Sequence, residues 1–300
     1  MKLSLWPATA LARYRGRSLL SASPIRTSAA PSARRSQSSS STNSSSPGQS
    51  PSVNASEISH FDSLASTWWD PHGSSRVLHL MNPHRHDFIH SCRASQADPP
   101  PASGRLRYLD VGCGGGIFAE SAARLASTES VTAVDPSVEI LAVARRHAAR
   151  DPAIAAPRLN YLNATIETLP QPTAPVDMYD VVTLFEVLEH VDNPSSFLER
   201  CGRFVRPGGW LVLSTIARTW TSWFTTNLVA EDILGMVPKG TPDWRKYINE
   251  DELRGYFARQ PGWGSPRVVG VVYVPGFGWK EIGGSEKLGN YFFAVRKVVE

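Results

Sequence analysis

The first 56 residues of this 300-residue chain contain no acidic residue, because the first carboxylate is Glu57. Seven basic residues precede it: Lys2, Arg13, Arg15, Arg17, Arg26, Arg34 and Arg35. A segment that is rich in arginine and serine and free of acid is typical of a mitochondrial transit peptide. We therefore predict a transit peptide with a disordered Ser-rich linker over residues 1–55 and one folded domain over 56–300. The alternative is a basic disordered tail without a targeting role.

Two further features are scarce or absent. No apolar run reaches 18 residues, so no transmembrane helix is expected. The three cysteines, Cys92, Cys113 and Cys201, have no paired spacing, which argues against a disulfide framework and against a zinc site. Of the 31 basic residues, 24 follow Glu57, against 27 acidic residues, so the remainder of the chain carries −3. The basic balance thus belongs to the N-terminal segment, and no nucleic-acid partner is expected.

A glycine-dense turn is the clearest motif that is present. Residues 108–116 read Y-L-D-V-G-C-G-G-G, an apolar strand followed by a turn and then by a helical pattern. Such a turn brings backbone N–H groups close to a ligand. The dinucleotide fingerprint needs glycine at its first, third and sixth positions; Gly112 and Gly114 fit, but the sixth position is Ile117. The turn, with Asp110 two residues before it, instead resembles motif I of class I S-adenosylmethionine (SAM) methyltransferases. A turn that binds no ligand remains the alternative.

Strands and helices alternate after this turn, which predicts a doubly wound, mostly parallel α/β sheet of seven strands. N-terminal helices precede the sheet, and a helical insertion follows the fifth strand at about residues 217–248. The expected strands are Leu106–Val111, Val131–Asp135, Leu159–Asn163, Tyr179–Phe185, Trp210–Ser214, Val268–Val274 and Asn290–Val298.

An acid closes the second expected strand. Asp135 lies 25 residues after Asp110, where a carboxylate accepts hydrogen bonds from both ribose hydroxyls of a nucleotide-like ligand. This role serves NAD and SAM alike, so it does not separate them. The alternative is that Asp135 caps the helix that follows.

The fourth strand runs into the segment F-E-V-L-E-H-V at residues 185–191. If the chain turns helical there, Glu186, Glu189 and His190 stand at i, i+3 and i+4 on one face. Two carboxylates and an imidazole suit a divalent cation, and oxygen-rich ligation favours Mg²⁺. Such a metal would hold two adjacent hydroxyls of a substrate, lower their pKa and generate the attacking oxyanion. Two alternatives remain: a pocket floor without metal, and His190 as a general base.

Four segments resemble one family, the ubiquinone-biosynthesis O-methyltransferases. They are A-S-T-W-W-D-P at 65–71, L-H-L-M-N-P-H-R at 78–85, D-V-G-C-G-G-G-I-F-A-E-S at 110–121 and E-D-I-L-G-M-V-P-K-G-T at 231–241. The resemblance implies transfer of a methyl group from SAM to a ring hydroxyl of 3,4-dihydroxy-5-polyprenylbenzoate and of demethylubiquinol. Residues 56–300 would then be one SAM-dependent methyltransferase domain.

The resemblance also assigns roles to individual residues. Arg85, Gly112, Asp135 and Phe185 match cofactor contacts, with Arg85 reaching the methionine moiety of SAM and Phe185 standing where relatives carry methionine. Glu186, Glu189 and His190 match the metal triad of the family. Glu186 and His190 are the expected catalytic residues.

Residues 219–244 combine tryptophan, phenylalanine and aliphatic side chains with flanking lysine and arginine. This mixture suits a bilayer interface, where a polyprenylated substrate resides. The expected location is therefore the matrix side of the mitochondrial inner membrane, as a peripheral protein, and the family resemblance implies association within a ubiquinone-biosynthesis complex. An ordinary core-packing helix hairpin is the alternative for this segment. For the whole chain, the alternatives are a methyltransferase for another phenolic or lipid acceptor, and a non-catalytic methyltransferase-like scaffold.

Overall fold

The computed structural model describes residues 52, 58–59, 62, 65–73, 75–95, 104–218, 246–274 and 276–298. All of them belong to the compact unit Gln49–Glu300. Apart from Ser52, the predicted transit peptide and linker lie outside the described residues. The predicted insertion also lies outside them, except for its ends at 217–218 and 246–248.

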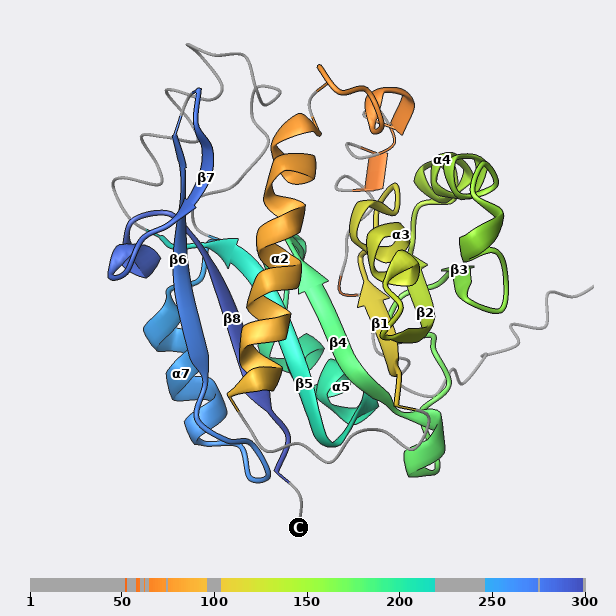
Figure 1. Cartoon of the computed structure of the whole chain (residues 1–300). Helices are drawn as coiled ribbons and strands as arrows, with labels where there is room; N and C mark the ends of the chain where they lie inside the picture. Colours follow the sequence, from red (N-terminus) through yellow and green to blue (C-terminus); the bar gives the residue numbers. More distant parts are fainter. Residues whose placement is uncertain are drawn as a thin grey trace, which may run out of the picture. The chain divides into compact units, whose positions relative to one another are not determined.

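The centre of the fold is an eight-stranded sheet with the order β3-β2-β1-β4-β5-β8-β6-β7 (Figure 1). Its strands are β1 Leu106–Val111, β2 Thr128–Asp135, β3 Leu159–Asn163, β4 Tyr179–Phe185, β5 Val205–Ile216, β6 Arg267–Val274, β7 Gly278–Glu281 and β8 Asn290–Arg296. Strands β1 to β5 are mutually parallel, whereas β8 is antiparallel to β5, and β6 is antiparallel to both β8 and β7. The predicted fold class is confirmed.

The sheet has one strand more than the seven expected. The additional strand is β7, which pairs with β6 at the edge of the sheet. Its four residues, G-W-K-E, are too few to show an alternation that identifies a strand in the sequence. This strand is therefore defined by its pairing with β6, and the sequence of its four residues alone does not identify it.

Helices cover both faces of the sheet (Figure 1). Helices α2 (Arg76–Ala94), α3 (Ile117–Arg124) and α4 (Val138–Ala148) lie on one face, and α5 (Pro194–Phe204) and α7 (Glu250–Ala258) on the other. Each face has its own core of buried apolar side chains. None of the described helices combines the length and the apolar character that crossing a bilayer would require.

The strand order reverses between β1 and β4, because β1 leads outward to β2 and β3 while β4 leads to β5. Ligands of doubly wound sheets bind outside the carboxyl ends of the strands at such a switch point. The glycine turn follows β1 and the E-x-x-E-H segment follows β4, so the two candidate motifs lie on either side of this point.

Candidate active site

The glycine turn is held against the end of β2. Gly112 N and Cys113 N both donate to Val134 O, at 2.8 and 3.1 Å. Gly112 has a φ of +71° and Gly116, which begins α3, has a φ of +89°. A Cβ atom at Gly112 would lie 2.7 Å from Val187 Cγ2, so the space beside this turn admits only glycine. Both the backbone conformation and the packing therefore require the residue type that the motif supplies.

Asp135 joins this turn to the start of α4. One carboxylate oxygen accepts from Gly114 N and the other from Ser137 N, each at 2.9 Å. Burial raises the pKa of Asp135, and these two amide hydrogen bonds oppose that rise. The residue at the N-cap of α4 is Ser137, whose side chain accepts from Ile140 N at 3.0 Å. The N-cap residue of α4 is thus Ser137, and Asp135 accepts from its backbone N–H.

Arg85 is a buried cation on α2, only 4% exposed. Its guanidinium carbon lies 4.7 Å from the centre of the Phe185 ring. Burial lowers the pKa of Arg85, while the negative charges of Glu186, Asp110 and Glu189 raise it. Arg85 Nε has no hydrogen-bond partner. A buried guanidinium with a free donor is suited to a carboxylate ligand.

Asp110, at 2% exposed, is a second buried carboxyl group in this region. Thr183 Oγ1 donates to it at 2.7 Å across the pair β1–β4. Burial raises the pKa of Asp110 to about 7, an effect that Thr183 and Arg85 oppose. The switch point therefore holds both signs of charge away from water, a combination that is common at functional sites.

The chain after β4 does not form the α-helix that the spacing argument assumed. Glu186 has a φ of 57°, the only positive φ of a non-glycine residue in the part of the chain that the structure describes. A three-residue 3-10 helix, Leu188–His190, follows it. Glu186 precedes this helix in a left-handed conformation, so it does not share an α-helical face with Glu189 and His190. Conformations of this kind cost free energy and cluster at ligand sites.

Two hydroxyl groups from the end of β5 hold the two glutamates. Ser214 Oγ donates to Glu186 Oε1 at 2.6 Å, and Thr215 Oγ1 donates to Glu189 Oε2 at 2.9 Å. Burial raises the pKa of Glu189 to about 7, with a further contribution from the charge of Glu186, whereas His190 lowers it. Glu186, Glu189 and His190 therefore affect one another electrostatically.

No described set of three or more His, Cys, Asp or Glu side chains is arranged in the structure as a metal site. The donor chemistry of Glu186 and Glu189 nevertheless fits a hard cation. Both offer carboxylate oxygens, which Mg²⁺ prefers, and each carboxylate is oriented by a hydroxyl group. Ser214 and Thr215 were not among the residues expected at the site from the sequence. Their polar side chains at the carboxyl end of the buried strand β5 are the feature of the sequence that could have indicated a role at the site.

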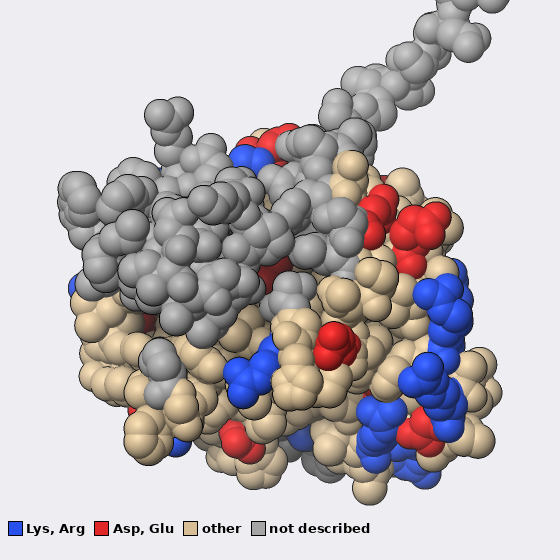
Figure 2. Space-filling view, turned by 90° about the horizontal axis from the view of Figure 1, so that it is seen from above, with Lys and Arg blue, Asp and Glu red and all other residues tan. Residues whose placement is uncertain are grey.

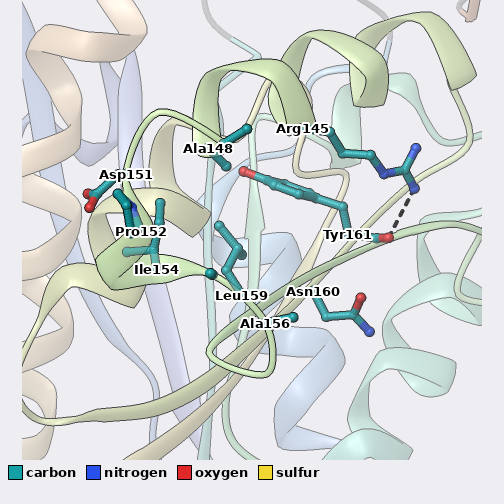
Figure 3. Close-up of a pocket in the computed structure, with 11 residues that line it drawn as sticks. Arg145, Ala148, Asp151, Pro152, Ile154, Ala156, Leu159, Asn160 and Tyr161 are labelled. Carbon is teal, nitrogen blue, oxygen red and sulfur yellow. Dashed lines mark hydrogen bonds between the residues drawn. The ribbon is translucent and has the colours of Figure 1, made fainter. Parts of the chain in front are cut away.

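A cavity of about 270 Å³ lies elsewhere, between α4, the segment 151–156 and β3 (Figure 3). Arg145 Nη2 donates to Tyr161 O at 3.0 Å at its border. The lining includes none of the predicted site residues. This cavity is therefore separate from the switch point.

Comparison with known proteins assigns the class. A family model described as a methyltransferase domain matches residues 81–260. The crystal structure of magnesium protoporphyrin IX methyltransferase from Synechocystis, with bound S-adenosylhomocysteine (SAH), covers 80% of this chain and 94% of its own, with a TM-score of 0.52 and 18% identity. At that identity the likeness shows the fold alone. Fold and family model together define a SAM-dependent methyltransferase.

Relatives of known function narrow this class. A protein from Candida albicans named mitochondrial ubiquinone biosynthesis O-methyltransferase is 38% identical over 82% of this chain and 86% of its own length. The protein of the same name from Schizosaccharomyces pombe is 43% identical over 82% of this chain and 87% of its own. This chain belongs to the ubiquinone biosynthesis O-methyltransferase family.

Proposed function

We propose that this enzyme transfers the methyl group of SAM to a ring hydroxyl of 3,4-dihydroxy-5-polyprenylbenzoate and of demethylubiquinol in mitochondria. Family membership supports the reaction and the pathway. The observation that carries the proposal is the pair of hydroxyl-bound glutamates beside a buried arginine at the switch point. The arginine is available to the carboxylate of the cofactor, and the two glutamates are available to the acceptor.

The β1–β2 side binds the cofactor. Arg85 pairs with the carboxylate of SAM through its guanidinium, which explains a buried cation with a free Nε donor. The backbone of the turn at Gly112 approaches the methionine moiety, and Asp135 accepts from the ribose hydroxyls. Phe185 forms an apolar wall and stacks under Arg85. SAM supplies an activated methyl group, and these residues fix its direction.

The β4–β5 side holds the acceptor. Glu186, Glu189 and His190 would bind a divalent cation, with Mg²⁺ favoured by the oxygen donors. The metal, when bound, lowers the pKa of the ring hydroxyls of the acceptor. Ser214 and Thr215 orient the carboxylates, since each donates to one of them. His190 ends the 3-10 helix that also carries Glu189, and it would complete the ligand set; without a metal it would instead take the proton of the acceptor hydroxyl.

The location that we propose is the matrix side of the inner membrane, as a peripheral protein within a biosynthetic complex. A polyprenyl tail requires access to the bilayer, and the aromatic and basic residues of 219–244 suit its surface. Figure 2 looks onto the carboxyl ends of strands β1 to β5, where uncharged described residues lie among acidic and basic ones.

The test is methyl transfer from labelled SAM by the full-length chain in the presence of phospholipid vesicles. The acceptors are a short-chain prenylated 3,4-dihydroxybenzoate and the same ring without its prenyl group. We expect transfer to the prenylated ring, loss of transfer in EDTA and recovery with Mg²⁺. Absence of transfer to either ring, while SAH binds, would point to another acceptor. Full transfer in EDTA would contradict the metal and leave His190 as the base.

A further inference from the structure

The chain ahead of α2, of which the structure describes residues 52, 58–59, 62 and 65–73 and which is called the N-terminal segment below, contacts the ends of three neighbouring strands. Ser52 O accepts from Asp192 N at 3.0 Å, just beyond the 3-10 helix that follows β4. Asp62 accepts from Ser137 Oγ after β2, and the next described stretch reaches the glycine turn after β1. These three positions surround the switch point at which the cofactor is proposed to bind. The described residues of the N-terminal segment thus form part of the wall of the cofactor site.

Trp68 is the member of this segment that lies closest to the glycine turn. A Cβ atom at Gly114 would stand 2.6 Å from Trp68 Cζ2, and one at Gly115 would stand 2.2 Å from Trp68 Cδ1. The indole therefore packs directly against backbone that carries no side chain. Trp68 is 7% exposed and forms a small buried cluster with Ile117 of α3 and Ile140 of α4. The absence of side chains at Gly114 and Gly115 leaves space for the Trp68 indole as well as for the proposed cofactor.

The next residue fixes the position of this indole. Trp69 Nε1 donates to Gly115 O at 2.9 Å. The Trp69 ring also stacks on His147, with centroids 3.4 Å apart and planes 6° from parallel. His147 Nδ1 lies 2.9 Å from both carboxylate oxygens of the fully buried Glu120. Trp68 is thereby held in place by a neighbour that is itself bonded to the turn.

The two tryptophans differ in one respect. Trp69 has a partner for its indole N–H, whereas Trp68 Nε1 is buried and has none. Arg85 Nε, also buried, shares this condition. A buried donor without an acceptor is rare, and a ligand that brings an acceptor explains it. The carboxylate, the ribose oxygens and the ring nitrogens of SAM are acceptors of that kind.

We propose that Trp68 is a cofactor-binding residue: its indole closes the site against the glycine turn, and its Nε1–H donates to an oxygen or ring nitrogen of bound SAM or SAH. This inference rests on the proposed function, because it takes SAM as the ligand. It does not depend on the identity of the acceptor.

The test compares two conservative substitutions in the full-length chain, with SAH as the ligand. Trp68→Phe keeps a ring at the turn and removes the N–H. Trp279→Phe is the matched control, because Trp279 is also buried and its Nε1 donates to Val77 O at 2.9 Å, outside the proposed site. The dissociation constant of SAH is measured by calorimetry. The indole N–H resonance that Trp68→Phe removes is then followed in ¹H–¹⁵N spectra of the unsubstituted protein during titration with SAH.

We expect Trp68→Phe to weaken SAH binding by about tenfold, the effect of one lost hydrogen bond, and Trp279→Phe to leave it within about twofold. The Trp68 N–H resonance should shift downfield and gain protection from exchange when SAH binds. Unchanged SAH affinity in Trp68→Phe, or a Trp68 N–H resonance that does not shift when SAH is added, would overturn the inference. Failure of methyl transfer to the prenylated ring, with these SAH results intact, would overturn only the proposed acceptor.

Discussion

The two sides of the switch point build their sites in different ways. On the β1–β2 side, the glycine turn and Asp135 form a network of backbone amides with one carboxylate, and the network is complete within the chain. On the β4–β5 side, Glu186 and Glu189 are two acids, each of which accepts a hydrogen bond from a hydroxyl group of β5. The amide network of the first side is satisfied within the chain, whereas the second side brings together two carboxylates, of which Glu189 is buried.

The two sides therefore respond differently to substitution. At a site built from backbone groups there is little space for added side-chain atoms, so substitutions there act by steric clashes. A carboxylate site depends on charge, so its substitutions act first on the chemistry of the acceptor side.

The largest expected effect is on the β4–β5 side. Glu189→Gln keeps the shape and the acceptor for Thr215 but removes the charge, and we expect methyl transfer to fall by about 100-fold or more. SAH affinity should stay within about twofold, because the cofactor side is unchanged. Radiolabel transfer and calorimetry on the same sample measure both. Glu139→Gln, at an exposed position of α4, is the control and should match the unsubstituted enzyme. An equal loss of SAH affinity and transfer in Glu189→Gln would contradict the separation.

The next effect is on the β1–β2 side. Gly116→Ala places a Cβ atom 2.1 Å from the Tyr161 hydroxyl at a φ of +89°. We expect the free energy of unfolding to fall by about 3 kcal/mol, because clash and strain add. Urea denaturation measures the loss. Gly283→Ala is the control, since no atom lies within 4 Å of its Cβ and its φ is not positive; it should be nearly neutral. Equal stability of the two variants would show that the turn is not sterically constrained.

A smaller effect concerns the cation that connects the two sides. Arg85→Lys keeps a positive charge but loses the planar pair of donors, so we expect SAH to bind about tenfold more weakly. Arg93→Lys, on the same helix but outside the site, should leave binding unchanged. Calorimetric titration with SAH separates the variants. Full affinity in Arg85→Lys would mean that the guanidinium does not contact the carboxylate of the cofactor.

The smallest effect is a pH dependence of stability next to the site. Burial, followed by the charge of Arg85, lowers the pKa of His86 to about 4. The unfolded chain therefore binds more protons than the folded chain between pH 4 and 6.5. The stability that neutral His86 contributes is complete above pH 6.5 and is lost as the pH falls toward 4. His86→Gln should reduce the loss of unfolding free energy between pH 7 and pH 5 by about 1 kcal/mol. His90→Gln, at an exposed position of α2, should show the same acid loss as the unsubstituted chain. Identical pH profiles for His86→Gln and the unsubstituted chain would contradict the assignment.

The sequence predicted best what short stretches of chain determine. The glycine turn after β1 and the acid after β2 follow from local pattern, and the alternation of strands and helices follows from hydrophobic period. The sequence did not predict conformations that depend on contacts between distant segments of the chain. The left-handed Glu186 and the short helix after it sit beside Ser214, 28 residues away, whose hydroxyl binds the carboxylate. Trp68 lies against Gly115, 47 positions further along, and no local pattern connects them.

The most direct test of the account is a paired measurement on one sample of full-length enzyme after treatment with EDTA. SAH is titrated by calorimetry before and after addition of Mg²⁺, and a single turnover of labelled SAM onto the prenylated ring is followed in both states. The account predicts the same SAH dissociation constant in both states and transfer only with Mg²⁺. Transfer at full rate in EDTA, or SAH binding that requires Mg²⁺, would contradict the division between a cofactor side that needs no metal and an acceptor side made of carboxylates.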